Sequence, residues 1–215
     1  MTKQLITLLD PESAKAIQEA AKLGSSMTDL AKEGGSWLSG VLGDLPRDIV
    51  GLFGDWVQFK RAERWIDYNT HVAALLKARG VQPPYADVSP SLAVPLITAA
   101  LDDSRDELKT LWARLLANAL DPARKDYVRN SFIDIIKRLE PLDALILQAV
   151  ATLSGEVLPN VYYAVAMRFS RGEDEVRVSL ENLTELRLVG SPQAVMQTHI
   201  YLTPKGKMLL RAVSE

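Results

Sequence analysis

The chain has 215 residues, of which 47% are apolar and 24% are charged, and its formal net charge is -2 at neutral pH. This composition can supply the core of one large domain or two small ones, and the near-neutral charge excludes a general affinity for nucleic acid. Because the sequence contains no cysteine, disulfides, thiolate nucleophiles and the commonest zinc sites are excluded as well.

The first 12 residues contain no basic segment followed by an apolar one, and no run of about 18 apolar residues occurs anywhere in the chain. We therefore expect a cytoplasmic protein without a spanning helix. Attachment to the periphery of the inner membrane is the membrane location that stays open.

Residues 1–55 are predicted to form a glycine-rich amphipathic helical segment. It holds seven of the 12 glycines of the chain, although each glycine inside a helix costs about 0.5–1 kcal/mol relative to alanine. One helical face gathers the large apolar side chains Trp37, Leu38, Val41, Leu42, Leu45, Ile49, Leu52, Phe53 and Trp56. The close-packing glycines Gly40, Gly43, Gly51 and Gly54 form a smooth stripe beside it.

This face predicts contact with a membrane surface or close packing on a partner, on a copy of itself or on the rest of the chain. Pro46 indicates two short helices rather than one. The polar positions include Asp44, Asp48 and Asp55 but only Arg47 with a positive charge. Interfacial helices usually carry a basic face, so the sequence favours packing over membrane binding.

Residues 56–141 are predicted to form a helical bundle. We expect its first helix over about 56–79, with Gly80 as the C-cap, and a short helix over about 91–101 that has Pro95 near its first turn or at a kink. Ser104 and Glu107 have capping-box spacing before the next helix.

Three successive apolar stripes with helical spacing cover residues 107–153. The first consists of Leu108, Leu111, Trp112, Leu115, Leu116 and Ala119, and the second of Val128, Phe132, Ile135, Ile136 and Leu139. The third consists of Leu142, Leu145, Ile146, Ala149, Val150 and Leu153. Asp121-Pro122 and Glu140-Pro141 separate the three helices. Amphipathic helices in succession must bury their apolar stripes against one another, so this region is predicted to form the core of a mainly α protein.

Residues 142–215 are predicted to form a winged helix-turn-helix-like module with a short β-ribbon. Its helices are expected over 142–153, 160–169 and 178–188, the last one after a charged turn at 171–175. A β-ribbon is expected to have Val189 on one arm and residues 199–203 on the other, and a closing helix is expected to begin at Pro204.

The residues do not indicate catalysis. The sequence contains two histidines, His71 and His199, and the Asp67–His71 pair at i, i+4 spacing is an ordinary helix-surface arrangement. Phosphate-binding loops, dinucleotide fingerprints and nucleophile elbows are absent from the sequence. We expect no enzyme, no cofactor, no metal site and no small-molecule substrate.

Winged modules often read DNA with their third helix, which then carries basic and amide side chains. Here the segment 173–187 has five acidic residues against Arg177 and Arg187, which would repel a phosphate backbone. Packing within the chain or protein contact is therefore the favoured use of the module. Lys205, Lys207 and Arg211 form the alternative nucleic-acid contact.

Several segments resemble the abortive-infection alpha family of bacteria. They are Leu111–Ala119 followed by Asp121-Pro122, Ser131–Ile133, Leu139–Ala144, Leu180–Leu183 and Thr203–Gly206. The resemblance covers most of the chain and implies anti-phage defence, in which an infected cell stops growing or dies before the virus matures. It carries over no catalytic residue.

We therefore expect a non-enzymatic defence protein that exposes the segment Trp37–Trp56 to a membrane or a partner. The alternatives are a winged-helix regulator or nucleic-acid sensor, and an oligomeric adaptor.

Overall fold

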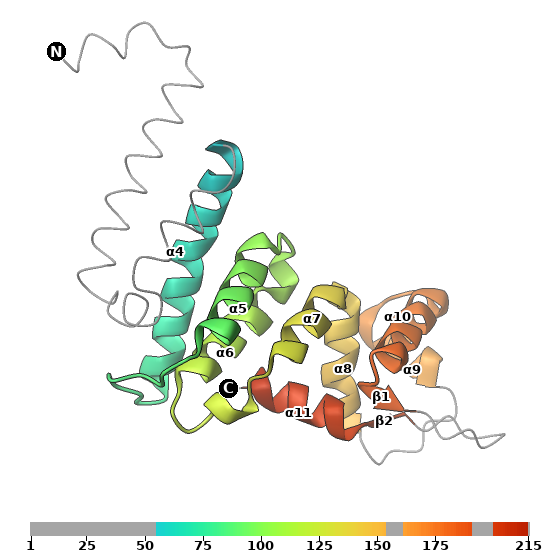
Figure 1. Cartoon of the computed structure of the whole chain (residues 1–215). Helices are drawn as coiled ribbons and strands as arrows, with labels where there is room; N and C mark the ends of the chain where they lie inside the picture. Colours follow the sequence, from blue (N-terminus) through green and yellow to red (C-terminus); the bar gives the residue numbers. More distant parts are fainter. Residues whose placement is uncertain (1–54, 154–160, 191–199, 215) are drawn as a thin grey trace, which may run out of the picture. The chain divides into compact units, whose positions relative to one another are not determined.

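The computed structural model describes residues 55–153, 161–190 and 200–214 (Figure 1). These ranges contain eight α-helices and one two-stranded antiparallel sheet near the C-terminus, so the predicted mainly α fold is confirmed for them. They fall into two compact units, divided between Ala93 and Val94. Over the same ranges, no helix combines the length and the hydropathy that crossing a bilayer requires. The predicted boundaries at residues 55/56 and 141/142 stay a prediction.

The first unit contains α4 (Asp55–Ala78). Tyr68, Val72 and Leu76 recur at four-residue intervals on this helix, and all three are buried. The helix ends as predicted at Gly80, whose positive φ of 70° suits glycine. The amides of Gly80 and Val81 donate to the carbonyls of Lys77 and Leu76, which is the paired closure of a Schellman motif.

Helix α5 (Pro90–Asp102) begins just before the division and continues into the second unit. Its predicted bounds are confirmed to within a residue. Pro95 lies inside the helix, where it has no amide hydrogen to donate to the preceding turn. Leu96, Ile97 and Leu101 are buried.

Two helices carry the first two apolar stripes. A short 3-10 turn at Asp106–Leu108 leads into α6 (Lys109–Leu120), and a second one at Lys125–Tyr127 precedes α7 (Asn130–Arg138). Every residue of both predicted stripes is buried. The predicted capping box is wrong, because neither start has a side-chain cap. Instead, Asp103 accepts the backbone amide of Arg105 at 3.0 Å, two residues later.

Helix α8 (Pro141–Leu153) confirms the third predicted helix but corrects its buried face. Leu145 is 46% exposed, whereas Ala144 and Leu147 are buried together with the predicted Ile146 and Val150. Because α8 is apolar around most of its circumference, residue spacing alone did not specify its rotation.

Helix α9 (Val161–Phe169) confirms the next prediction, but α10 (Glu173–Glu185) begins and ends earlier than expected. The charged segment that was expected to be a turn supplies three acidic residues to the first turn of α10. Negative charge is stabilising at that end because it faces the positive end of the helix dipole.

The predicted ribbon and closing helix are confirmed. Strand β1 (Val189–Gly190) pairs antiparallel with β2 (Tyr201–Leu202), and α11 (Pro204–Ala212) follows with proline in its first turn. The Thr203 side chain accepts the Gly206 amide at 3.0 Å and caps the helix.

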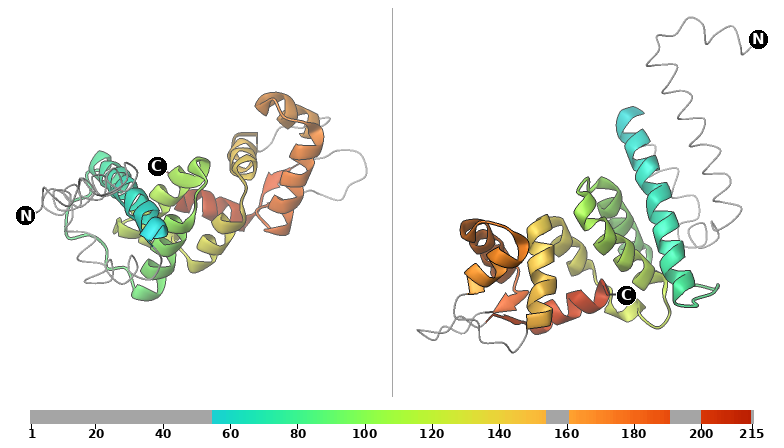
Figure 2. Two further views of the ribbon diagram at one scale, coloured as in Figure 1. Left: turned by 90° about the horizontal axis from the view of Figure 1, so that it is seen from above. Right: turned by 180° about the vertical axis from the view of Figure 1, so that it is seen from behind.

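Within the second unit, α6, α7, α8 and α10 follow one another across the fold (Figures 1 and 2). In the view of Figure 1, α11 runs below this row, across the lower ends of α7 and α8. Helix α10 packs on α8 and α9, while α11 packs on α6, α8 and β2. The C-terminal elements are therefore joined directly to the helices of the predicted bundle.

Candidate functional site

The sequence-predicted contact face lies almost wholly outside the described residues. This holds for Trp37, Leu38, Val41, Leu42, Leu45, Ile49, Leu52 and Phe53, and for the glycines Gly40, Gly43, Gly51 and Gly54. Trp56 lies in α4. The predicted role of this face stays a prediction.

The three basic residues predicted for nucleic-acid contact all lie on α11 but do not act alike. Lys205 donates its Nζ to the carbonyl of Leu186 at 3.1 Å, and so binds the C-terminal end of α10. Lys207 and Arg211 are exposed and one helical turn apart. The structure thus places two of the three on one exposed stripe.

The Asp67–His71 pair lies on exposed positions of α4. In the part of the chain that the structure describes, no three histidine, aspartate or glutamate side chains gather as they would around a metal ion.

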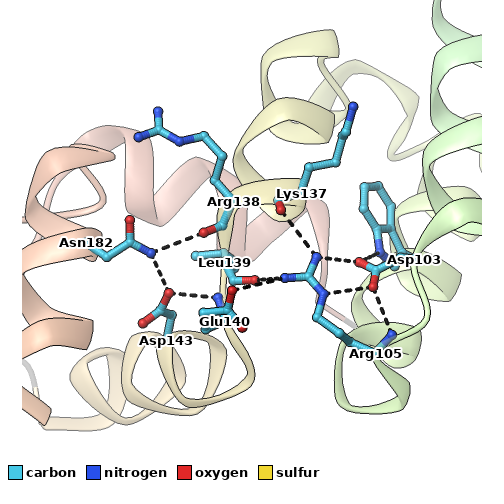
Figure 3. Close-up of polar contacts among 9 residues, drawn as sticks. Asp103, Arg105, Lys137, Arg138, Leu139, Glu140, Asp143 and Asn182 are labelled. Carbon is cyan, nitrogen blue, oxygen red and sulfur yellow. Dashed lines mark hydrogen bonds and ion pairs between the residues drawn. The ribbon is translucent and has the colours of Figure 1, made fainter. Parts of the chain in front are cut away.

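A polar cluster in the second unit joins α5 and α6 to the end of α7 (Figure 3). Asp103, directly after α5, accepts from Nε and Nη2 of Arg105 at 2.8 and 2.7 Å, which makes a two-pronged ion pair. The indole Nε1 of Trp112 donates to the same carboxylate at 2.9 Å. Trp112 is fully buried, and the Asp103 side chain is 4% exposed. The carboxylate is thus held on both sides.

The far side of the Arg105 guanidinium caps α7. Nη1 donates to the carbonyl of Leu139, and Nη2 donates to the carbonyl of Lys137 at 3.3 Å. The last carbonyls of a helix have no partner within the helix, and a cation is favoured beside them. One guanidinium therefore satisfies the end of α7 and the buried Asp103 together.

The cluster continues on the other side of the α7–α8 junction (Figure 3). Asp143, which is 1% exposed, accepts the backbone amide of Glu140 at 2.8 Å and Nδ2 of Asn182 at 2.5 Å. The same Nδ2 lies 3.2 Å from the carbonyl of Arg138. Asn182 belongs to α10, so its amide ties that helix to the end of α7 and the start of α8. An exposed ion pair, Arg138 Nη2 to Glu185 Oε1 at 2.6 Å, lies alongside.

The electrostatics of the cluster favour its charged forms. Burial raises the pKa of the Asp103 carboxyl, but the hydrogen bonds donated by Arg105 and Trp112 outweigh burial and hold that pKa below its usual value. The hydrogen bond to Asp103 raises the pKa of the Arg105 guanidinium. Both groups stay ionised at neutral pH, so the cluster is suited to holding helices in place.

A second buried amide anchors the C-terminal helix. Asn118 of α6 is fully buried, and its Nδ2 donates to the carbonyl of Ala212 at 2.7 Å. It thereby binds the last turn of α11, whose carbonyls have no partner within the helix. Trp112 and Asn118 both belong to α6. This largely apolar helix therefore supplies the hydrogen bond to Asp103 and the hydrogen bond to the end of α11.

Sequence reasoning did not single out Asp103, Arg105, Asp143 or Asn182 as site residues. Two signals were nevertheless present: Asp143 and Asn182 fall inside segments that carry the family resemblance, and Asp103 and Arg105 lie between two apolar helices. Their opposite charges, only two residues apart, are a pattern that indicates an ion pair.

The comparisons with known proteins agree with the earlier resemblance. A family model described as abortive infection alpha matches residues 60–205. No curated protein and no solved structure matches the chain. The matched range contains Asp103, Arg105, Trp112, Asn118, Asp143 and Asn182.

Proposed function

Because the chain belongs to the abortive infection alpha family, we propose that it is a bacterial anti-phage protein that acts through a contact rather than through catalysis. Membership of this family suggests a role in abortive infection. The family match is the observation that carries the defence role, and the properties of the described residues support the non-catalytic part.

The state of the buried polar cluster supports a non-catalytic role. A general acid or base works best when its pKa lies near the operating pH. The pKa of Asp103 is lowered and that of Arg105 is raised, so both pKa values lie farther from neutral pH than usual. The hydrogen bonds between the two side chains stabilise the charged form of each. These two groups are suited to stabilising the fold and not to exchanging protons.

The effector contact that we propose is the apolar face from Trp37 to Trp56. By this proposal, infection releases the face from a packed resting state to a membrane surface or to a partner. The proposal is supported by the sequence, in which large apolar residues share one face of a predicted helix with a stripe of glycines beside it.

Expression in a bacterial host tests the effector contact. We expect the wild type to arrest growth during phage infection, and we expect the double variant Trp37→Ala with Phe53→Ala to relieve the arrest at equal protein level. A control double variant, Gln82→Ala with Asp87→Ala, removes two exposed side chains between α4 and α5 and should leave the arrest unchanged. Equal arrest by all three proteins would refute the proposed contact.

Vesicle leakage separates the membrane from a protein partner. If the face acts on lipid, the full chain releases dye from anionic or neutral liposomes, and the Trp37→Ala with Phe53→Ala variant does not. Growth arrest without leakage by the wild type would assign the contact to a protein partner.

We further propose that α8–α11 with the β1–β2 ribbon form a winged-helix-like module. Its order of three helices, a ribbon and a closing helix supports this, and the charge of its third helix favours a protein partner. The exposed residues of α10 include Glu173, Asp174, Glu175, Glu181 and Glu185, which would repel nucleic-acid phosphates.

The alternative of a nucleic-acid sensor has a direct test. DNA and RNA are titrated into the full chain at two salt concentrations, because phosphate binding must weaken as salt rises. A salt-dependent affinity that Lys207→Glu with Arg211→Glu abolishes would favour the sensor over the protein-contact module.

A further inference from the structure

A surface pocket lies between α9, α10 and the β1–β2 ribbon. Its apolar lining includes Tyr162, Leu180, Val189 and Ile200, and the exposed Glu181 and Thr184 also face it. Its volume of about 200 Å³ is below the roughly 300–1,000 Å³ of typical small-molecule sites. A pocket of this size suits a single anchoring side chain of a protein partner.

The charge around the pocket selects the kind of anchor. Asp174, Val178 and Glu181 recur at intervals of three or four residues on α10 and are all exposed, so they form one stripe. The next residue of the stripe, Glu185, is paired with Arg138. The guanidinium of Arg177 lies over the Tyr162 ring, 5.1 Å from its centroid. An apolar anchor flanked by positive charge is the complement of this surface.

The chain itself carries such an anchor. Large apolar side chains that are exposed in the described residues are Tyr127, Leu145, Tyr163, Met167, Val178 and Tyr201. Four of these belong to the elements that form the pocket. Of the other two, Tyr127 is the aromatic one, and the exposed Lys125 and Arg129 lie two residues to either side of it.

The segment 124–129, here called the basic loop, cannot reach the pocket of its own chain. Arg124 lies beside the C-terminal end of α11, with Nη1 3.5 Å from the carbonyl of Ser214. The ribbon lies at the other end of that helix, which follows β2 directly. In Figures 1 and 2, the yellow-green basic loop and the orange α9 and α10 lie at opposite ends of the second unit.

We propose that Tyr127 of one copy inserts into the α9–α10–ribbon pocket of a second copy, with Lys125 and Arg129 facing the acidic stripe of α10. Each chain then offers one basic loop and one pocket, so the contact is heterologous. Such contacts continue until they close into a ring or extend as an open chain.

The apolar segment from Trp37 to Phe53 fits the pocket less well than the basic loop does. Its aspartates Asp44 and Asp48 outnumber its single basic residue, Arg47, so Glu181 and Asp174 would repel it. Charge complementarity therefore assigns the pocket to the basic loop of a second copy.

A charge-swap experiment on the full chain tests the proposal. In Glu181→Lys the pocket and the loop are both basic, and in Lys125→Glu with Arg129→Glu both are acidic, so neither variant should self-associate. Mixing the two variants should restore association, because the loop of the first fits the pocket of the second. Sedimentation velocity at low and high salt measures this, and added salt should weaken the complex.

Two single changes test the anchor and provide the control. Tyr127→Ala should weaken self-association by about tenfold or more, as expected when an aromatic anchor is removed. Glu107→Lys makes the same charge reversal as Glu181→Lys at an exposed position on a different element, and should leave association unchanged. A monomeric wild type, self-association of either charge variant alone, or a mixture that stays monomeric would overturn the proposal.

Discussion

Arg105 holds Asp103 by two parallel hydrogen bonds of 2.8 and 2.7 Å, and the other edge of the same guanidinium reaches the last carbonyls of α7. The pair is separated by a single residue in the sequence, yet it connects elements that lie more than 30 residues apart. A guanidinium can do this because its five donors point in fixed directions within one plane.

Removal of the guanidinium should destabilise the protein strongly. In Arg105→Ala, the buried Asp103 and the carbonyls of Lys137 and Leu139 lose their donor, so the free energy of unfolding should fall by about 2–4 kcal/mol. Arg105→Lys should recover only part of this loss, because an ammonium cannot reproduce the two-pronged geometry. Urea unfolding measures both variants.

The matched control for these variants is Arg171→Ala, which removes an exposed arginine between α9 and α10. It should change the free energy of unfolding by no more than about 0.5 kcal/mol. An equal effect of the two alanine variants would contradict the role given to Arg105.

Acid should remove the contribution of Asp103. Its folded pKa is held below the ordinary value of 3.8, so the folded state stabilises the carboxylate. The contribution is present above about pH 4 and is lost as the pH falls through the folded pKa. We expect the difference in unfolding free energy between wild type and Asp103→Asn to be constant near neutrality and to shrink below about pH 4.

Unfolding at a series of pH values measures this difference. Asp126→Asn, which removes an exposed carboxylate, is the control for the loss of one acidic group. A wild-type advantage over Asp103→Asn that grew on acidification would show that the sign of the shift is wrong.

Asn182→Asp should destabilise the junction of α7, α8 and α10. The substitution replaces a donor that lies 2.5 Å from Asp143 Oδ2 by a second carboxylate. Repulsion between the buried Asp143 and a half-buried carboxylate should cost about 2–4 kcal/mol at neutral pH. Acidification should relieve part of the loss, because one proton shared between the carboxylates removes the repulsion.

Thermal unfolding at neutral and acidic pH follows Asn182→Asp. Asn130→Asp makes the same change at the exposed first residue of α7, where negative charge is tolerated. Equal melting temperatures of the two variants at neutral pH would refute the proposed contact between Asp143 and Asn182.

Gly206→Ala should be poorly tolerated. A Cβ at this position would lie 2.1 Å from the carbonyl oxygen of Leu188, so α11 would have to move away from the segment that leads into β1. We expect a loss of about 2–4 kcal/mol in the free energy of unfolding.

Gly172→Ala is the matched control, since a Cβ there would meet no atom within 4 Å. Because Gly172 is the N-cap of α10, where alanine is less favourable than glycine, its cost should be about 1 kcal/mol or below. Equal denaturant midpoints of the two glycine variants would show that the protein tolerates a Cβ at position 206 next to the Leu188 carbonyl.

Most of the helices could be predicted from the sequence because their signals are local. The stripes around Trp112 and Phe132, the glycine that ends α4 and the proline that begins α11 act over three or four residues, within one turn of a helix. The start of α10 was missed because its acidic residues suit an exposed turn and a helix N-terminus equally well.

The sequence by itself determined which segments are helical, where most of them end, and that α10 carries acidic charge. Only the tertiary structure decided that Leu145 faces outward while Asp143 is buried, and that Arg105 caps a helix more than 30 residues away. The physical reason is range. Helical periodicity depends on residues that are close together in the sequence. A buried charge, in contrast, is stable only where the packing of distant helices supplies its hydrogen-bond partners.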